Sequence, residues 1–157
     1  KKAPWGAGVV PVAEVGVLTP EEFVDQRAAF DAKSERDVPS VLGAVRVLQE
    51  LRVQFDILDT HADLSKYKLL ILPDDYPVND PMAERLTAFV AAGGKLIATH
   101  RSGLYLDRSG FAPGIGELLG IAYHGDAPYS PDFLVPGDEL RKLGGANGRE
   151  AAHVMYM

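Results

Sequence analysis

The clearest pattern of apolar and polar positions lies between residues 69 and 99, where two apolar runs flank a segment with helical spacing. The first run, residues 69–72, has four consecutive apolar residues and is typical of a buried strand. The second run, residues 95–99, is again strand-like. Between them the apolar residues recur every three or four positions, which places them on one face of a helix. The pattern therefore predicts a strand, a helix and a strand in succession.

Residues with known conformational preferences mark both ends of this helix. Asp80 stands before Pro81, which suits an N-cap followed by proline in the first turn. The Gly93-Gly94 pair suits the C-terminus, because glycine readily adopts the left-handed conformation in which many helices end. A right-handed crossover brings the carboxyl ends of both strands to one edge of the sheet. In open α/β sheets, ligands bind at that edge.

A weaker form of the same alternation precedes this unit. Residues 12–18 and 53–59 are apolar enough for two more strands, and residues 41–52 carry apolar positions at helical spacing. Residues 1–11 contain two prolines and two glycines, and we interpret them as a lead-in linker. The order β-α-β-β-α-β predicts an α/β domain of flavodoxin-like outline, with a parallel sheet and helices on both faces.

The pattern changes after residue 103. Glycines and prolines interrupt the apolar positions, and residues 115–119 form the one short helical segment that we expect there. From residue 121 onward aromatic residues, prolines and glycines alternate, as in irregular strands or a loop packed on another surface. We interpret residues 12–157 as a single domain, and we expect the chain to be a fragment of a larger protein.

The composition indicates a globular chain and argues against two kinds of partner. The 157 residues are 46% apolar and 24% charged, enough for one sizeable core. The net charge of −6 disfavours nucleic acid and anionic membranes, which bind clustered basic residues. No apolar run approaches the roughly 18 residues that span a bilayer. Nothing specifies a compartment, and we favour the cytoplasm.

The chain contains no cysteine, which excludes disulfides, cysteine-bound zinc and a cysteine nucleophile. His61, His124 and His153 do not have the spacing of metal ligands. Residues 114–116 read G-I-G, but no strand leads directly into them, so they make a weak nucleotide-binding fingerprint. We expect neither a metal nor a cofactor.

Polar residues follow the two best-defined strands at the expected carboxyl edge of the sheet. Asp74 and Asp75 come after residues 69–72, and they could bind Mg²⁺ or a sugar hydroxyl, or pair with Arg101. His100 could donate a hydrogen bond to one of these acids or belong to a ligand site. We predict a polar cluster of Asp74, Asp75, His100 and Arg101 that orients loops or meets a partner.

The turn at residues 99–103 raises an alternative function, that of a small hydrolase or amidotransferase-like enzyme. In nucleophile-elbow proteins a strand ends in a sharp G-x-S-x-G type of turn that exposes the nucleophile. Here the turn reads T-H-R-S-G, with Arg101 or Ser102 at its tip. Ser102 and His100 are the weak candidates for catalysis, because a base usually arrives from another loop. The structural alternative is that Ser102 caps the turn.

A third possibility is a sugar-binding module. Tyr105, Tyr123 or Tyr129 would then supply the aromatic platform on which a sugar ring stacks. Packing of these aromatic rings, or an interface with another domain, explains the same residues. Carbohydrate therefore stays a possible partner in this interpretation.

The strand, helix and turn sequences carry a resemblance to a known family. The segments are Y-K-L-L-I-L-P at residues 67–73, A-E-R-L-T-A-F-V-A-A-G-G at residues 83–94 and L-I-A-T-H-R-S-G at residues 96–103, followed by Asp107. This pattern resembles the middle domain of family 42 β-galactosidases, called the β-galactosidase trimerisation domain. The resemblance covers about residues 12–125 and is most specific over residues 67–104.

The resemblance implies a fold related to class I glutamine amidotransferases, which keep a cysteine at the elbow, whereas this chain has none. It further implies a non-catalytic accessory domain that builds an oligomer or docks onto a catalytic domain. In the family, two glutamates on a separate TIM barrel cleave the glycoside, and the domain in some members helps to wall a neighbour's active site. Similar domains occur in other glycoside-hydrolase-like proteins, so specificity for galactosides does not follow.

Overall fold

The computed structural model describes residues 12–20 and 39–125, with Gly8, Phe23 and the backbone of residues 132–134 and 154–156. The chain divides into two compact units, residues 1–123 and 124–157, which we describe separately. The domain boundaries expected from the sequence stay a prediction. Tyr129 and His153 further on, lie outside the described residues.

The first unit contains a four-stranded parallel sheet. Its strands are β1 (Val15–Leu18), β2 (Phe55–Leu58), β3 (Leu69–Leu72) and β4 (Lys95–Ala98). The strand order is β2-β1-β3-β4, and every neighbouring pair is parallel. This order is that of flavodoxin-like sheets, so the predicted fold class is confirmed.

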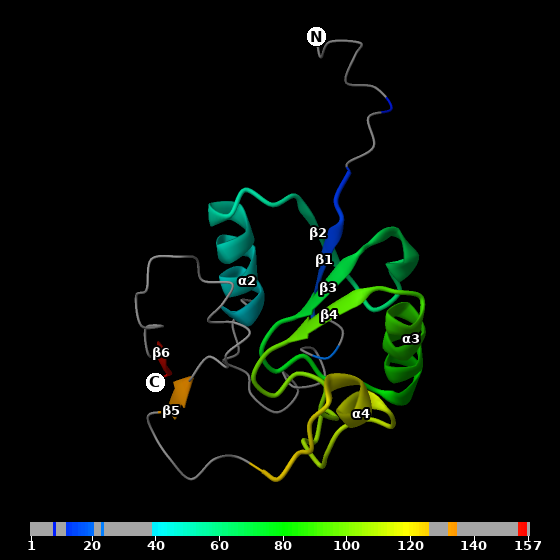
Figure 1. Cartoon of the computed structure of the whole chain (residues 1–157), viewed down its shortest axis with the longest axis vertical. Coiled ribbons are helices and arrows are strands. Elements are labelled where there is room, and N and C mark those ends of the chain that lie inside the picture. The colour runs from blue at the N-terminus through cyan, green and yellow to red at the C-terminus, as the bar shows by residue number, and fades with distance from the viewer. Residues whose placement is uncertain are drawn as a thin grey trace, which may run out of the picture. The chain divides into compact units, whose positions relative to one another are not determined.

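Two long helices connect the strands, and α2 (Pro39–Glu50) and α3 (Asp80–Ala91) lie on opposite sides of the sheet (Figure 1). A 3-10 turn, η2 (Leu64–Lys66), precedes β3, and the short helix α4 (Ile115–Leu119) follows β4. Helices therefore cover both faces, as predicted. Glycines in the left-handed conformation flank α4, with φ values of 79° at Gly114 and 70° at Gly120.

The predicted N-cap of α3 is wrong by one residue. The cap is Asn79, whose side-chain oxygen accepts a hydrogen bond from the main-chain N–H of Met82 at 3.0 Å. Asp80 is instead the first helical residue, where its negative charge interacts favourably with the helix dipole. Both residue types are good caps, so the sequence pattern does not distinguish them.

The face of the sheet that α3 covers, the α3 face, holds the larger part of the core. Strand residues that point to this face include Leu18, Leu70 and Leu72, each at most 1% exposed. On α3 itself Leu86 is fully buried and Phe89 is 8% exposed. Residues from α4 and the loop before it close the same cluster, so this face is covered by two helices and a loop.

The opposite face, the α2 face, is covered less completely. Val15 and Val17 of β1 pack against Val41 and Leu48 of α2, which form a smaller buried cluster. At the two edge strands the apolar side chains of this face remain open to solvent: Ile57 is 55% exposed and Ile97 is 46% exposed.

Strand β4 ends the sheet on one side. Lys95 and Thr99 donate main-chain hydrogen bonds to the carbonyls of Lys68 and Leu72, at 2.8 and 3.2 Å. Because parallel pairing alternates along a strand, the main-chain groups of Leu96 and Ala98 point away from β3. Within the described part of the chain, no strand pairs with this outer edge.

The second unit contains one described antiparallel pair of strands. They are β5 (Asp132–Leu134) and β6 (Val154–Tyr156), and Phe133 lies opposite Met155. This pairing differs from the parallel sheet of the first unit, and it is consistent with the change of sequence texture after residue 103. In the described ranges no helix combines the length and the apolarity that a membrane span requires.

Candidate functional site

The loops that follow β3 and β4 are joined at the carboxyl edge of the sheet. The N–H of Gly103 donates to the carbonyl of Tyr76 at 3.0 Å, and the N–H of Val78 donates to the carbonyl of Leu104 at 2.9 Å. Gly103 has a φ of 97°, and an added Cβ would come within 2.9 Å of Ile115. Both the backbone conformation and the lack of space therefore require glycine there.

Ser102 links the same two loops through its side chain. It is 2% exposed, its hydroxyl donates to the carbonyl of Pro73, and it accepts from the N–H of Tyr76 at 3.2 Å. A hydroxyl has a single proton, and here that proton is held by a main-chain oxygen instead of a base. This geometry favours a structural role for Ser102 over that of a nucleophile.

His100 and Asp75, two of the predicted edge residues, approach each other. The Nδ1 of His100 lies 4.0 Å from Oδ1 of Asp75, and a guanidinium nitrogen of Arg108 lies 3.6 Å from the same oxygen. The side chains are 50%, 35% and 46% exposed for His100, Asp75 and Arg108, so solvent screens these ion pairs. Such pairs contribute about 0–1 kcal/mol each.

The backbone at these residues is unusual. His100, Asp75 and Arg108 have φ values of 51°, 62° and 59°, a region that non-glycine residues seldom occupy. Three of the four non-glycine residues with positive φ in the described chain thus meet in one cluster. The sharp turn after β4 places His100 in this conformation.

Arg108 is the residue that sequence reasoning missed. The predicted partner of the edge acids was Arg101, which is half-buried, as is Asp74. Arg108 comes from the loop after the turn, more than thirty residues beyond Asp75 in the sequence. No local pattern in the sequence indicates that this loop brings Arg108 to the edge.

Tyr105 attaches the loop after the turn to α3. Its hydroxyl donates to Oδ1 of Asp80 at 2.5 Å, and this hydrogen bond, with a smaller contribution from burial, raises the pKa of the Tyr105 phenol. On the same loop the Ser109 hydroxyl donates to Asp107 at 2.7 Å, and the bond lowers the pKa of that carboxyl. Tyr123 packs edge-on against Phe111, with ring centroids 6.1 Å apart.

No metal site emerges from these groups: the described residues contain no set of three His, Asp or Glu side chains arranged to hold an ion. The edge therefore presents a half-exposed cluster of an imidazole, a guanidinium and a carboxylate above loops held by main-chain hydrogen bonds. Such a surface can orient loops and form polar contacts.

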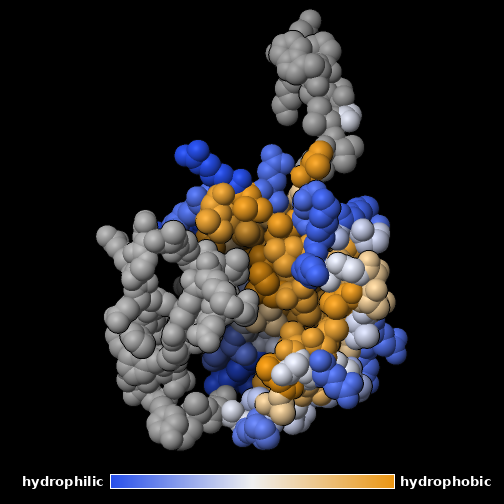
Figure 2. All heavy atoms as spheres, in the orientation of Figure 1, coloured by the Kyte–Doolittle hydropathy of each residue, from blue (hydrophilic) through white to orange (hydrophobic). Residues whose placement is uncertain are grey.

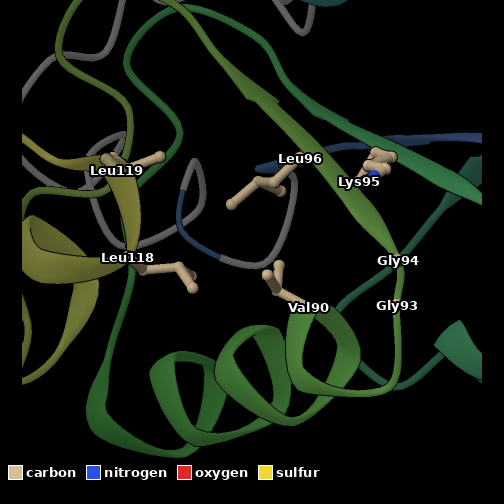
Figure 3. Close-up of a pocket in the computed structure, with 7 residues that line it drawn as sticks. All are labelled: Val90, Gly93, Gly94, Lys95, Leu96, Leu118 and Leu119. Atoms are coloured by element: carbon tan, nitrogen blue, oxygen red, sulfur yellow. The ribbon is translucent and has the colours of Figure 1, made fainter.

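A pocket of about 290 Å³ lies at the opposite end of β4, away from this cluster. Figure 3 shows Val90 of α3, Leu96 of β4, and Leu118 and Leu119 of α4 directed into it. Gly94 forms part of its wall, and a side chain there would collide with the ring of Phe89. Gly93 and Lys95 complete the lining of the pocket.

Comparison with known proteins agrees with this fold. A family model described as the β-galactosidase trimerisation domain matches residues 36–122, more than half of the chain. The β-galactosidase BglY of Alicyclobacillus acidocaldarius is 30% identical over 96% of this chain and 24% of its own length.

Solved structures of glycosidases also contain a region similar to this chain. The α-L-fucosidase isoenzyme 2 of Paenibacillus thiaminolyticus is 31% identical, with a TM-score of 0.68 over 97% of this chain and 21% of that chain. The β-galactosidase of Bacillus circulans sp. alkalophilus is 27% identical, with a TM-score of 0.60 over 83% of this chain and 20% of that chain. This chain spans about a quarter or less of the length of BglY and of these two enzymes.

The fold and the site thus define a flavodoxin-like accessory domain in which the turn after β4 has no cysteine and the Ser102 hydroxyl donates to a main-chain carbonyl. The chain belongs to the β-galactosidase trimerisation domain family, and this domain is a non-catalytic part of the enzymes that contain it.

Proposed function

We propose that the chain holds a glycoside hydrolase together as an oligomer, through contacts between copies, and leaves bond cleavage to another domain. The observation that carries the proposal is the family match over residues 36–122, combined with relatives that are glycosidases several times longer. The commitment of the Ser102 proton to a main-chain carbonyl supports the non-catalytic part.

The sugar specificity belongs to the parent enzyme in this proposal. The similar proteins include both β-galactosidases and an α-L-fucosidase. Domains like this one therefore accompany catalytic domains that act on different glycosides, and the chain itself selects none of them. The predicted cytoplasmic location stays a prediction.

The test compares the natural gene product that carries this chain with the chain alone. Sedimentation velocity should show that the gene product is an oligomer, and a gene product that remains a monomer at micromolar concentration would refute the proposal. Assays with aryl β-galactosides and aryl α-L-fucosides should show hydrolysis by the gene product and none by the chain. Turnover by the chain that Ser102→Ala abolishes would establish the hydrolase alternative instead.

A further inference from the structure

The α2 face leaves a continuous apolar surface between α2 and β4. Along α2, Val41 and Leu48 face the sheet, whereas Val47 and Leu51 share one flank of the helix because they are four residues apart. Since the β1-α2-β2 crossover is right-handed, this flank faces β3 and β4, and the opposite flank, with Leu42, faces β2. Figure 2 shows apolar surface over the end of α2 that continues over the neighbouring strands of the sheet.

We call this surface the open half-face and define it by Val47, Leu51, Ile71 and Ile97. Val47, Leu51 and Ile97 are 55%, 67% and 46% exposed, and Ile71 is half-buried. Single exposed apolar side chains are common on protein surfaces. A contiguous group contributed by three elements is not, and such patches mark interaction sites.

We propose that the open half-face is the place where one copy of the chain meets another. The inference rests on the proposed function, and it identifies the surface through which the copies associate. The occupant is a second copy because the family to which the chain belongs is a trimerisation domain. A stable interface buries about 800 Å² on each partner. The open half-face supplies the apolar centre of such an interface, and the surrounding surface supplies its rim.

The distribution of charge fits this occupant. In a three-fold assembly the side chains near the axis meet their own copies, so a charged side chain there would face like charges. The four residues of the open half-face are uncharged. Charged side chains lie around them: Arg46 and Glu50 form an exposed ion pair at 3.0 Å on α2, and Lys95 is exposed at the start of β4. An apolar centre with a charged rim is the usual composition of a protein interface.

The experiment introduces a charge on each flank of α2 in the natural gene product. Val47→Arg and Ile97→Arg alter the open half-face, and Leu42→Arg and Ile57→Arg are matched controls on the β2 side, at 58% and 55% exposure. Sedimentation velocity across a concentration series gives the dissociation constant of the oligomer. The first pair should raise it about 100-fold or more, because like charges would meet in the interface. The control pair should leave it within threefold.

The outcomes separate the inference from the proposed function. A wild-type protein that is a monomer removes the proposed function. A wild-type oligomer that survives Val47→Arg and Ile97→Arg, or that dissociates with the control pair, overturns only the choice of surface. Far-UV circular dichroism identifies any variant that has unfolded.

A second measurement does not depend on inserted charge. Maleimide labelling, located by peptide mass spectrometry, compares the thiols of the Ile97→Cys and Ile57→Cys variants, since this chain has no native cysteine. The Ile97→Cys thiol should react at least tenfold more slowly in the oligomer than after dilution to monomer, and the Ile57→Cys thiol should not. Equal protection at the two positions would contradict the proposed surface.

Discussion

On the α3 face of the sheet Leu70 and Leu72 are at most 1% exposed, whereas on the α2 face the edge residues Ile57 and Ile97 are 55% and 46% exposed. The same strands supply both sets, because successive side chains of a strand point to opposite faces. Among the described residues, two helices and a loop cover one face, and a single helix covers the other. Strands that are apolar on both sides are typical of a parallel sheet buried on both sides. The sequence thus carries apolar residues for a cover that the described chain supplies on one face only.

The largest difference between the faces should appear on truncation of strand residues. Leu70→Ala removes a fully buried side chain and should lower the free energy of unfolding by about 3 kcal/mol. Ile97→Ala, at a residue that is 46% exposed, should cost about 1 kcal/mol. Urea denaturation of the dilute chain measures both, and equal losses would contradict the comparison.

Hydrogen bonds from a side chain of α3 also stabilise the packing of this helix on the α3 face. Arg85 of α3 donates from its two terminal nitrogens to the carbonyls of Thr60 and Ala62, in the segment between β2 and β3. Arg85→Ala should lower the free energy of unfolding by about 2 kcal/mol, because the hydrogen bonds are charge-assisted. Arg85→Lys retains the charge but not the fork geometry, and its loss should be intermediate in the same urea experiment.

At the carboxyl edge the expected effect is smaller. Ser102→Ala removes a buried hydroxyl that joins the two loops, and it should cost about 1 kcal/mol, since the N–H of Tyr76 keeps a second acceptor in the carbonyl of Pro73. Ser109→Ala is the control, because its hydroxyl lies on an exposed loop and donates to Asp107 of the same loop. Thermal unfolding should show a lower midpoint for Ser102→Ala alone.

The smallest expected effect is a change of stability with pH that comes from the hydrogen bond between Tyr105 and Asp80. The folded pKa of Tyr105 lies above its unfolded value of 10.0, so folding favours the protonated phenol. The stabilisation is complete below pH 10 and is lost as the pH rises through the folded pKa. A spectroscopic titration of phenolate should lose, in Tyr105→Phe, a component that titrates above pH 10, and loss of a component that titrates at or below pH 10 would refute the assignment.

Much of the first unit could be predicted from the sequence because its signals are local. The apolar run of β3 and the spacing along α3 gave both elements within one residue of their observed ends. The glycines around α4 fixed that helix at residues 115–119 as observed. The cap of α3 was missed because Asn79 and Asp80 are both suitable, and only the hydrogen bond to Met82 distinguishes them.

The candidate site was less predictable because its contacts are not local. His100 and Asp75 each follow a strand end, and Nδ1 of His100 lies 4.0 Å from Oδ1 of Asp75. The approach of Arg108 depends on how an irregular loop returns to that edge, and no spacing rule describes such a loop. The positive φ of His100 was equally hidden, since the sequence pattern suggested Arg101 or Ser102 for the tip of the turn.

The outer edge of β4 has a practical consequence for anyone who produces this chain in isolation. No strand of the described residues pairs with the outward main-chain groups of Leu96 and Ala98, which therefore form a template for backbone pairing between molecules, next to the exposed side chain of Ile97. Natural edge strands discourage such pairing with lysine or proline, and β4 has one lysine, at its first residue. Recombinant material should therefore precipitate or form fibrils at concentrations where its core remains fully folded. Substitutions that stabilise the core would not prevent this association, because it takes place between folded molecules.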